Sequence, residues 1–148
     1  MNEIAAIRPA DRPLTADPQR SYTLPARCYT DPAIHAAERD AIFFRNWWQV
    51  AHRSRLAEPG SYVTARIHDQ NVFVLRGRDG MLRGFFNVCQ HRGHQLVKGE
   101  GRRPTITCPY HAWSWDLQGD LRKARNSENV PDFDPCLFRL PQIRVEEL

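Results

Sequence analysis

Two short stretches of the sequence each combine one cysteine with one histidine. Cys89 and His91 are separated by a single residue, whereas Cys108 and His111 are separated by two. Thiolate sulfur and imidazole nitrogen are the side-chain ligands that zinc ions and iron–sulfur clusters use. Each pair follows residues with strand character, so the two loops can face each other at one end of a β-sandwich. These four residues therefore predict one metal centre held between two loops.

The identity of the metal depends on how the ligand types are shared between the loops. Zinc sites usually place two residues of one type on each knuckle or helix. Here each loop carries a mixed pair. A [2Fe–2S] cluster with two cysteines on one iron and two histidines on the other needs both loops to reach both irons. The mixed pairs favour this cluster, and a structural zinc module is the alternative.

The residues around the two pairs resemble a known motif. The stretches CQHRG (89–93) and CPYHAW (108–113) resemble the two halves of the Rieske motif. Arg92, Gly93 and Trp113 make them similar to the alpha subunits of Rieske non-haem iron oxygenases, which are ring-hydroxylating and demethylating enzymes. The resemblance extends over roughly residues 24–145. Ala112 stands where these subunits often have glycine.

The resemblance implies a site, a cofactor and partners. The ligands of a Rieske-type [2Fe–2S] cluster would be Cys89, His91, Cys108 and His111. The residues surrounding these ligands would be Arg92, Gly93, Tyr110, Trp113 and Trp115. In the family, a reductase or ferredoxin supplies electrons. The cluster relays them to a mononuclear non-haem iron in a catalytic oxygenase domain, usually that of a neighbouring subunit in a trimer.

Histidine ligation determines the expected redox behaviour. With neutral histidines the oxidised cluster has no net charge, so it accepts an electron more easily than a cluster with four thiolates. The outer ring nitrogens of His91 and His111 are expected to face solvent and to couple reduction to proton uptake.

Comparison with respiratory Rieske proteins, which this chain also resembles, refines the expected potential. Those relatives have a disulfide at the positions of His94 and Tyr110, and hydroxyl donors to the cluster sulfurs at the positions of Trp113 and Trp115. Fewer donors stabilise the reduced cluster less. We therefore expect a reduction potential near the low end of the roughly −150 to +300 mV range.

The rest of the chain predicts a mainly β fold with one helix. The sequence has 11 prolines and 8 glycines, which indicates a loop-rich, strand-rich chain. Apolar residues at helical spacing after Asp31-Pro32 predict a helix over 31–46. Alternation and turn residues predict strands at 48–51, 61–68, 71–76, 81–86, 105–107, 113–116, 121–124 and 138–145, with a loop at 126–136. The pattern indicates an antiparallel sandwich or barrel, and the resemblance implies a Rieske-type sandwich with a cluster-binding subdomain.

Residues 1–30 contain four prolines and no periodicity, which predicts an extended arm. We therefore divide the chain into an arm and helix, 1–46, and a Rieske [2Fe–2S] domain, 47–148.

Charge and hydropathy exclude several classes of protein. The chain has 21 Lys and Arg against 17 Asp and Glu, and a net charge of +4 is too small to indicate nucleic-acid binding. No apolar run predicts a membrane span, and residues 1–20 lack the apolar core of a signal peptide. We expect a cytoplasmic protein, in which Cys28 and Cys136 are free thiols rather than a disulfide.

Further residues near the motif have competing interpretations. His94 is expected to be a loop residue rather than a ligand. Four tryptophans are expected to pack in the core and shield the cluster: Trp47, Trp48, Trp113 and Trp115. Four exposed cations form either a solvated surface or a docking patch for an acidic electron donor: Arg92, Lys98, Arg102 and Arg103.

The residues that would hold a mononuclear iron are missing. The histidines outside the motif show no grouping of two histidines and a carboxylate. The chain alone is therefore expected not to activate oxygen, and whether it is an enzyme stays open. Its predicted function is electron transfer within an oxygenase, and a free-standing Rieske ferredoxin is the alternative.

Overall fold

The computed structural model describes residues 16–21, 23–127 and 129–148. The chain divides into two compact units, with the boundary between Asn46 and Trp47. Each unit is described by itself.

The first unit contains short helices. They are α1 (Arg27–Thr30), α2 (Pro32–Glu38) and a π-helical turn, η1 (Arg39–Phe43). The Asp31 carboxylate accepts a hydrogen bond from the Ala33 N–H at 2.8 Å, and Pro32 is the first residue of α2. The predicted helix start is thus confirmed. The prediction of one helix to residue 46 was wrong, because the α-helical pattern ends at Glu38.

Helix α1 lies within the segment for which the sequence predicted an extended arm. A single turn of four residues is too short for apolar periodicity to reveal it. None of the residues in α1, α2 and η1 is buried. The predicted arm over residues 1–15 lies outside the described residues.

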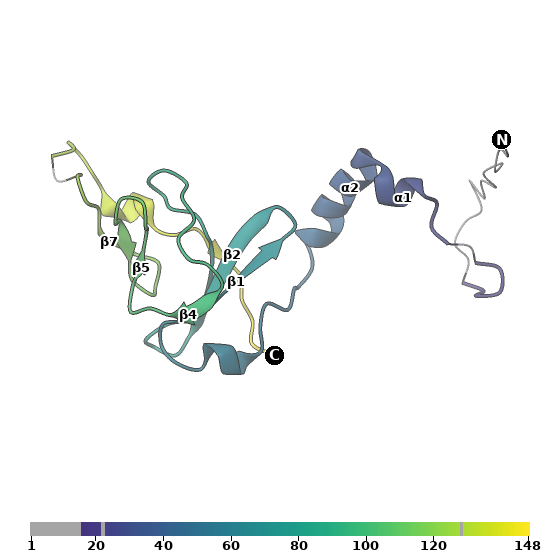
Figure 1. Ribbon diagram of the computed structural model, residues 1–148, viewed down its shortest axis with the longest axis horizontal. Coiled ribbons are helices and arrows are strands. Elements are labelled where there is room, and N and C mark those ends of the chain that lie inside the picture. Colours follow the sequence, from purple (N-terminus) through teal and green to yellow (C-terminus); the bar gives the residue numbers. More distant parts are fainter. Residues whose placement is uncertain (1–15, 22, 128) are drawn as a thin grey trace, which may run out of the picture. The chain divides into compact units, whose positions relative to one another are not determined.

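The second unit is built from two antiparallel sheets (Figure 1). The larger sheet has the order β4-β1-β2-β3-β8, and the smaller one has the order β5-β6-β7. The strands of the larger sheet are β1 (Ser61–Ile67), β2 (Gln70–Arg76), β3 (Leu82–Phe86), β4 (Glu100–Arg102) and β8 (Gln142–Ile143). Those of the smaller sheet are β5 (Ile106–Thr107), β6 (Ser114–Trp115) and β7 (Leu121–Lys123). The predicted antiparallel, mainly β fold is confirmed.

Two hairpins lie close to the predicted strands 61–68, 71–76 and 81–86. In β1–β2 the register pairs Val63 with Val74, and in β2–β3 it pairs Arg76 with Leu82. Between β2 and β3, the Gly77 N–H donates to the Met81 carbonyl at 2.8 Å, which closes the turn between the strands predicted at 71–76 and 81–86. Strand β2 is buried on both faces, because Phe73 and Leu75 belong to the main core and Val74 packs with Leu56 and Val63 on the other side.

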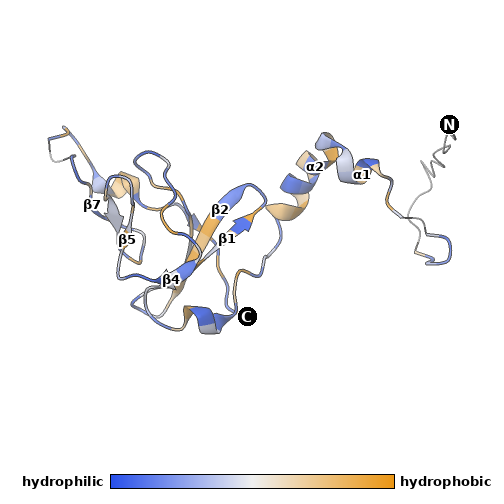
Figure 2. Ribbon diagram, viewed as in Figure 1, coloured by the Kyte–Doolittle hydropathy of each residue, from blue (hydrophilic) through white to orange (hydrophobic). Residues whose placement is uncertain are grey.

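Some elements differ from the predictions. Strand β4 was not predicted, because its residues, Glu-Gly-Arg, are all exposed and hydrophilic (Figure 2). Residues 48–51 form no strand, and the predicted strand over 138–145 shortens to β8. A 3₁₀ turn, η3 (Pro135–Phe138), occupies the end of the predicted loop. A second 3₁₀ turn, η2 (Arg53–Leu56), precedes β1.

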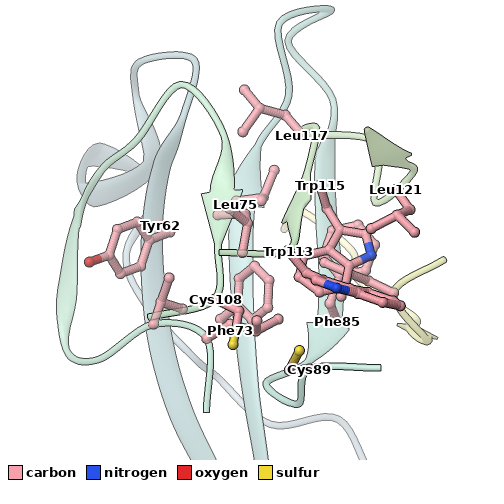
Figure 3. Packing of buried hydrophobic residues seen from close by; sticks show 14 residues of the cluster. Tyr62, Phe73, Leu75, Phe85, Cys89, Cys108, Trp113, Trp115, Leu117 and Leu121 are labelled. Carbon is pink, nitrogen blue, oxygen red and sulfur yellow. The ribbon is translucent and has the colours of Figure 1, made fainter. Parts of the chain in front are cut away.

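The main core lies between the two sheets (Figure 3). Phe73 and Phe85 from the larger sheet meet Trp115 from the smaller one, and all three are fully buried. The indole N–H of Trp115 donates to the Phe138 carbonyl at 2.7 Å, so the ring is buried without an unpaired polar group. Removing such a ring would cost about 3–5 kcal/mol of folding free energy.

A smaller cluster of Leu56, Val63 and Val74 forms a second patch of core, with Val50 and Val145 packed against it. Trp47 and Trp48 are 59% and 42% exposed, so the prediction that they pack in the core was wrong. The Arg144 guanidinium instead lies 4.9 Å from the Trp47 ring centroid.

Among the described residues, no helix has the length and apolar character needed to cross a membrane.

Candidate metal centre

The four predicted ligands lie on two loops with the same backbone construction. We call residues 89–94 the first loop and residues 108–113 the second loop. In the first loop the Cys89 N–H donates to the His94 carbonyl at 2.8 Å. In the second loop the Cys108 N–H donates to the Trp113 carbonyl, also at 2.8 Å. Each cysteine therefore bonds to the residue five positions later, and each loop folds back to its own start.

A second hydrogen bond closes each loop at the same place. The Gly93 N–H donates to the Cys89 carbonyl at 2.9 Å, and the Ala112 N–H donates to the Cys108 carbonyl at 3.0 Å. Both donors have left-handed backbone conformations, with φ of 68° at Gly93 and 60° at Ala112. The glycine of the first half of the motif therefore has a conformational role, and Ala112 adopts the same conformation with a side chain.

The two cysteines meet at one end of the main core (Figure 3). Cys89 is 3% exposed and Cys108 is 2% exposed, and both are free thiols. Burial raises the pKa of the Cys89 thiol, and its contact with Cys108 raises it further. The backbone N–H groups of His91 and Arg92 point toward the same sulfur and oppose this increase in pKa. A pair of buried thiols without a disulfide is a natural pair of ligands for a thiophilic metal.

The two histidines form a second pair beside the surface. The ring centroids of His91 and His111 lie 4.9 Å apart, and both residues are partly exposed. The pKa of His91 is lowered by burial and by the neighbouring His111 and Arg92. The Nδ1 atom of His111 is buried and has no hydrogen-bond partner among the described residues. A buried nitrogen that lacks a partner is costly, and coordination to a metal would satisfy it.

These residues fit a two-iron cluster, because two cysteines and two histidines are the protein ligands that a mixed cluster takes. In a mixed [2Fe–2S] cluster each iron needs only two protein ligands, because sulfide ions supply the others. One cysteine pair and one histidine pair match that requirement.

The other predicted residues around the ligands take different positions. Trp113 is 4% exposed, and its indole N–H donates to the Arg125 carbonyl at 3.2 Å. Tyr110 is 59% exposed and stacks on the His111 ring with centroids 3.8 Å apart. The His94 ring lies 5.7 Å from that of Tyr110, on the exposed side of the first loop. The structure therefore brings Trp113 and Tyr110 to the ligand rings and keeps Trp115 within the core.

The exposed cations are spread over two segments. Arg92 lies in the first loop, and Lys98 lies shortly before β4. Arg102 lies in β4, where its side chain donates to the Pro59 carbonyl at 3.0 Å, and Arg103 follows it.

Cys28 and Cys136 are free thiols, as expected.

Sequence reasoning missed the buried amide of Asn87. Its side-chain oxygen accepts hydrogen bonds from the N–H groups of Leu96 and Val97, each at 3.0 Å. Its side-chain nitrogen donates to the Val97 carbonyl at 2.7 Å and to the Asn71 side chain at 3.2 Å. The amide thus joins the chain before the first loop to the chain after it. A polar residue within the apolar run FFNVC was the signal that could have identified it.

Two phenylalanines, one from the predicted loop at 126–136 and one from the start of the predicted strand at 138–145, also went unrecognised. Phe133 and Phe138 place their edges against the Trp113 ring, at 5.7 and 5.4 Å between centroids. Nothing in the local sequence pattern of 126–138 indicates that these rings reach the metal-site loops.

Comparisons with known proteins agree with this geometry. A family model described as the Rieske [2Fe-2S] domain matches residues 46–134. The carnitine monooxygenase oxygenase subunit of Escherichia coli (strain K12) is 49% identical over 133 residues, which is 89% of this chain and 36% of that protein. This chain therefore spans about a third of the length of that relative.

Solved structures give the same result. The quaternary ammonium Rieske monooxygenase CntA in complex with L-carnitine superposes with a TM-score of 0.81 at 43% identity, covering 86% of this chain and 36% of that one. Naphthalene 1,2-dioxygenase with bound indole has a TM-score of 0.74 at 34% identity, covering 80% of this chain and 27% of that one. Because the family model covers more than half of its length, the chain belongs to the Rieske [2Fe–2S] domain family, in the form found in oxygenase subunits.

Proposed function

We propose that this chain is the electron-relay portion of an oxygenase, with Cys89, His91, Cys108 and His111 as the four ligands of its cluster. When bound, a [2Fe–2S] cluster of this family accepts and returns one electron at a time. The observation that carries the proposal is the pairing of two buried thiols with two partly exposed imidazoles, one of which has a buried Nδ1 without a partner.

The two kinds of ligand have different tasks in this proposal. Cys89 and Cys108 lie in the main core and anchor the site there. The surrounding core residues keep water away from the two sulfur atoms. His91 and His111 lie at the partly exposed side, so electrons enter and leave through their rings. The buried rings around the cysteines lower the local dielectric constant, and this limits how much negative charge the site accepts.

A donor protein would approach the histidine side. Arg92 and Lys98 are exposed and have no ion-pair partner among the described residues. Their charges support docking of an acidic reductase or ferredoxin near the first loop. The acceptor would be a mononuclear iron held by a catalytic domain of a neighbouring subunit in a trimer. Cytoplasmic location stays a prediction.

The relatives favour one substrate class for the whole oxygenase. The carnitine monooxygenase subunit is 49% identical and CntA is 43% identical, against 34% for naphthalene 1,2-dioxygenase. We therefore favour oxidation of a small quaternary ammonium compound over hydroxylation of an aromatic ring. The substrate-binding residues would lie in the catalytic domain.

Spectroscopy of the purified chain tests the ligand assignment. The chain should contain two irons and two sulfides and give the electron paramagnetic resonance (EPR) signal of a mixed-ligand cluster after reduction. His111→Ala and Cys108→Ala should each abolish that signal. His94→Ala is the matched control, because it removes a neighbouring loop histidine and should leave iron content and spectrum unchanged. One zinc per colourless chain would refute the proposal.

A further inference from the structure

The indole of Trp113 lies flat against the ring of His91. The two centroids are 4.6 Å apart and the planes differ by only 7°. The residues belong to different loops, so this contact joins the second loop to a proposed ligand of the first. Nearly parallel planes at this centroid distance form an offset stack, in which the indole packs against one face of the imidazole.

The indole of Trp113 is held in place by hydrogen bonds and by two aromatic rings. Its N–H donates to the Arg125 carbonyl, and the Trp113 carbonyl accepts the N–H of Cys108. Phe133 and Phe138 meet the indole nearly at right angles, with interplanar angles of 83° and 81°. With 4% of its surface exposed, Trp113 has no room to rotate. The imidazole of His91 therefore packs against a fixed plane.

A second pair of rings also joins the two loops, but its rings are not parallel. Trp113 is the fifth residue after Cys108 and touches His91, the second residue after Cys89. His94 is the fifth residue after Cys89 and touches Tyr110, the second residue after Cys108. That reciprocal pair is exposed and tilted by 45°, with centroids 5.7 Å apart. The shared loop construction thus brings both pairs together, but only Trp113 makes a flat contact.

We propose that Trp113 is a positioning residue that fixes the ring plane of His91 and thereby the direction of the nitrogen that binds iron. A histidine ring rotates about its last side-chain bond over a broad energy minimum, so its direction needs an external constraint. Ligands of metal sites commonly receive that constraint from neighbouring groups. Among the described residues, the ring that stacks on His111 is that of Tyr110, which is exposed and therefore less constrained than the buried indole. The proposal rests on the proposed function only in taking His91 as a ligand.

The test compares two substitutions of Trp113 with a matched one nearby. Trp113→Phe keeps a flat ring, and Trp113→Leu removes it. Trp115→Leu is the control, because Trp115 is also a buried tryptophan of the same core. Its ring centroid lies 6.4 Å from that of Trp113, and it does not stack on a proposed ligand. The measurements are iron content, the EPR g-values of the reduced chain and the reduction potential.

We expect Trp113→Phe to keep the parent g-values and potential, and Trp113→Leu to shift both. Trp115→Leu should lower thermal stability without shifting either. Parent-like g-values and potential in Trp113→Leu would overturn the proposal. If Trp113→Leu fails to hold iron, it is replaced by Trp113→Met, whose longer and more flexible apolar side chain adapts to the gap without a plane. Loss of iron in both non-planar Trp113 variants, while Trp115→Leu keeps iron, supports the proposal, and equal loss in Trp115→Leu overturns it. An absent mixed-ligand signal in the parent chain would instead refute the proposed function.

Discussion

Gly93 and Ala112 occupy equivalent positions in the two ligand loops, each four residues after a cysteine and each with a left-handed backbone. An added Cβ at Gly93 would meet no atom within 4 Å, so glycine serves its backbone conformation there rather than a lack of space. Ala112 holds the same conformation at a steric cost of about 1–2 kcal/mol.

Replacing Ala112 by glycine should stabilise the folded chain. Relief of the left-handed strain exceeds the added chain entropy of glycine, and the net gain should be about 0.5–1 kcal/mol. Gly93→Ala should lose a similar amount. Denaturant unfolding of the iron-loaded chain measures both. A lower free energy of unfolding for Ala112→Gly would contradict the loop geometry.

Asn87→Ala should destabilise the first loop strongly. The substitution leaves the buried N–H groups of Leu96 and Val97 without acceptors, which should cost about 3 kcal/mol. Asn71→Ala is the control, because Asn71 is exposed and shares only one of the hydrogen bonds of Asn87, so its cost should stay below about 1 kcal/mol. Thermal unfolding and retention of iron distinguish the two variants, and equal losses would argue against the role of Asn87.

Arg92→Glu should slow electron uptake from an acidic donor. Reversal of an exposed charge beside the histidines changes the association rate, on the order of fivefold at low salt, and the effect should shrink as salt rises. Arg78→Glu makes the same charge change on the turn between β2 and β3, at the opposite end of β3 from Cys89. Stopped-flow reduction by a ferredoxin or reductase measures the rates. Equal slowing by both variants would indicate an effect of net charge, without local docking.

The reduction potential should lie near the low end of the roughly −150 to +300 mV range. The indole N–H groups of Trp113 and Trp115 both donate to backbone carbonyls, so neither is available to a cluster sulfur. Fewer donors leave the reduced form less stabilised. A redox titration that returned a strongly positive potential would show that other donors dominate.

Asp79 should contribute to the acid sensitivity of folding. Its carboxylate accepts hydrogen bonds from the Arg83 guanidinium, at 2.8 and 2.6 Å, and from the Met81 N–H, and these hold its pKa well below the usual range of an aspartate. A carboxyl whose pKa is lowered by folding contributes stability that is fully present above its unfolded-state pKa and is lost as the pH falls toward its folded-state pKa. The difference in unfolding free energy between the parent and Asp79→Asn should therefore shrink between about pH 5 and 3. Arg83→Gln should reproduce the effect, and a difference independent of pH would contradict it.

The sequence by itself determined the family and most of the larger sheet, and it supplied the four proposed ligands. The motif formed by Cys89, His91, Cys108 and His111 could be recognised in the sequence, because the two members of each pair lie within four residues of each other. The hairpins of β1, β2 and β3 could be predicted because β1 alternates in sequence, β2 is a short β-branched and aromatic run, and glycine-containing turn residues lie between β2 and β3. The start of α2 was readable because a capping aspartate and a proline act within one turn.

Only the tertiary structure decided which residues surround those ligands. Asn87, Phe133 and Phe138 reach the loops across the fold, and no local pattern reports contacts between distant segments. The same reason explains the misplaced tryptophans. Trp47 and Trp113 are equally apolar in sequence, but one lies at the start of its unit against Arg144, and the other closes a loop and packs on His91. The burial of a side chain depends on which other segments of the chain pack over it, and only the assembled sheets show which segments do so.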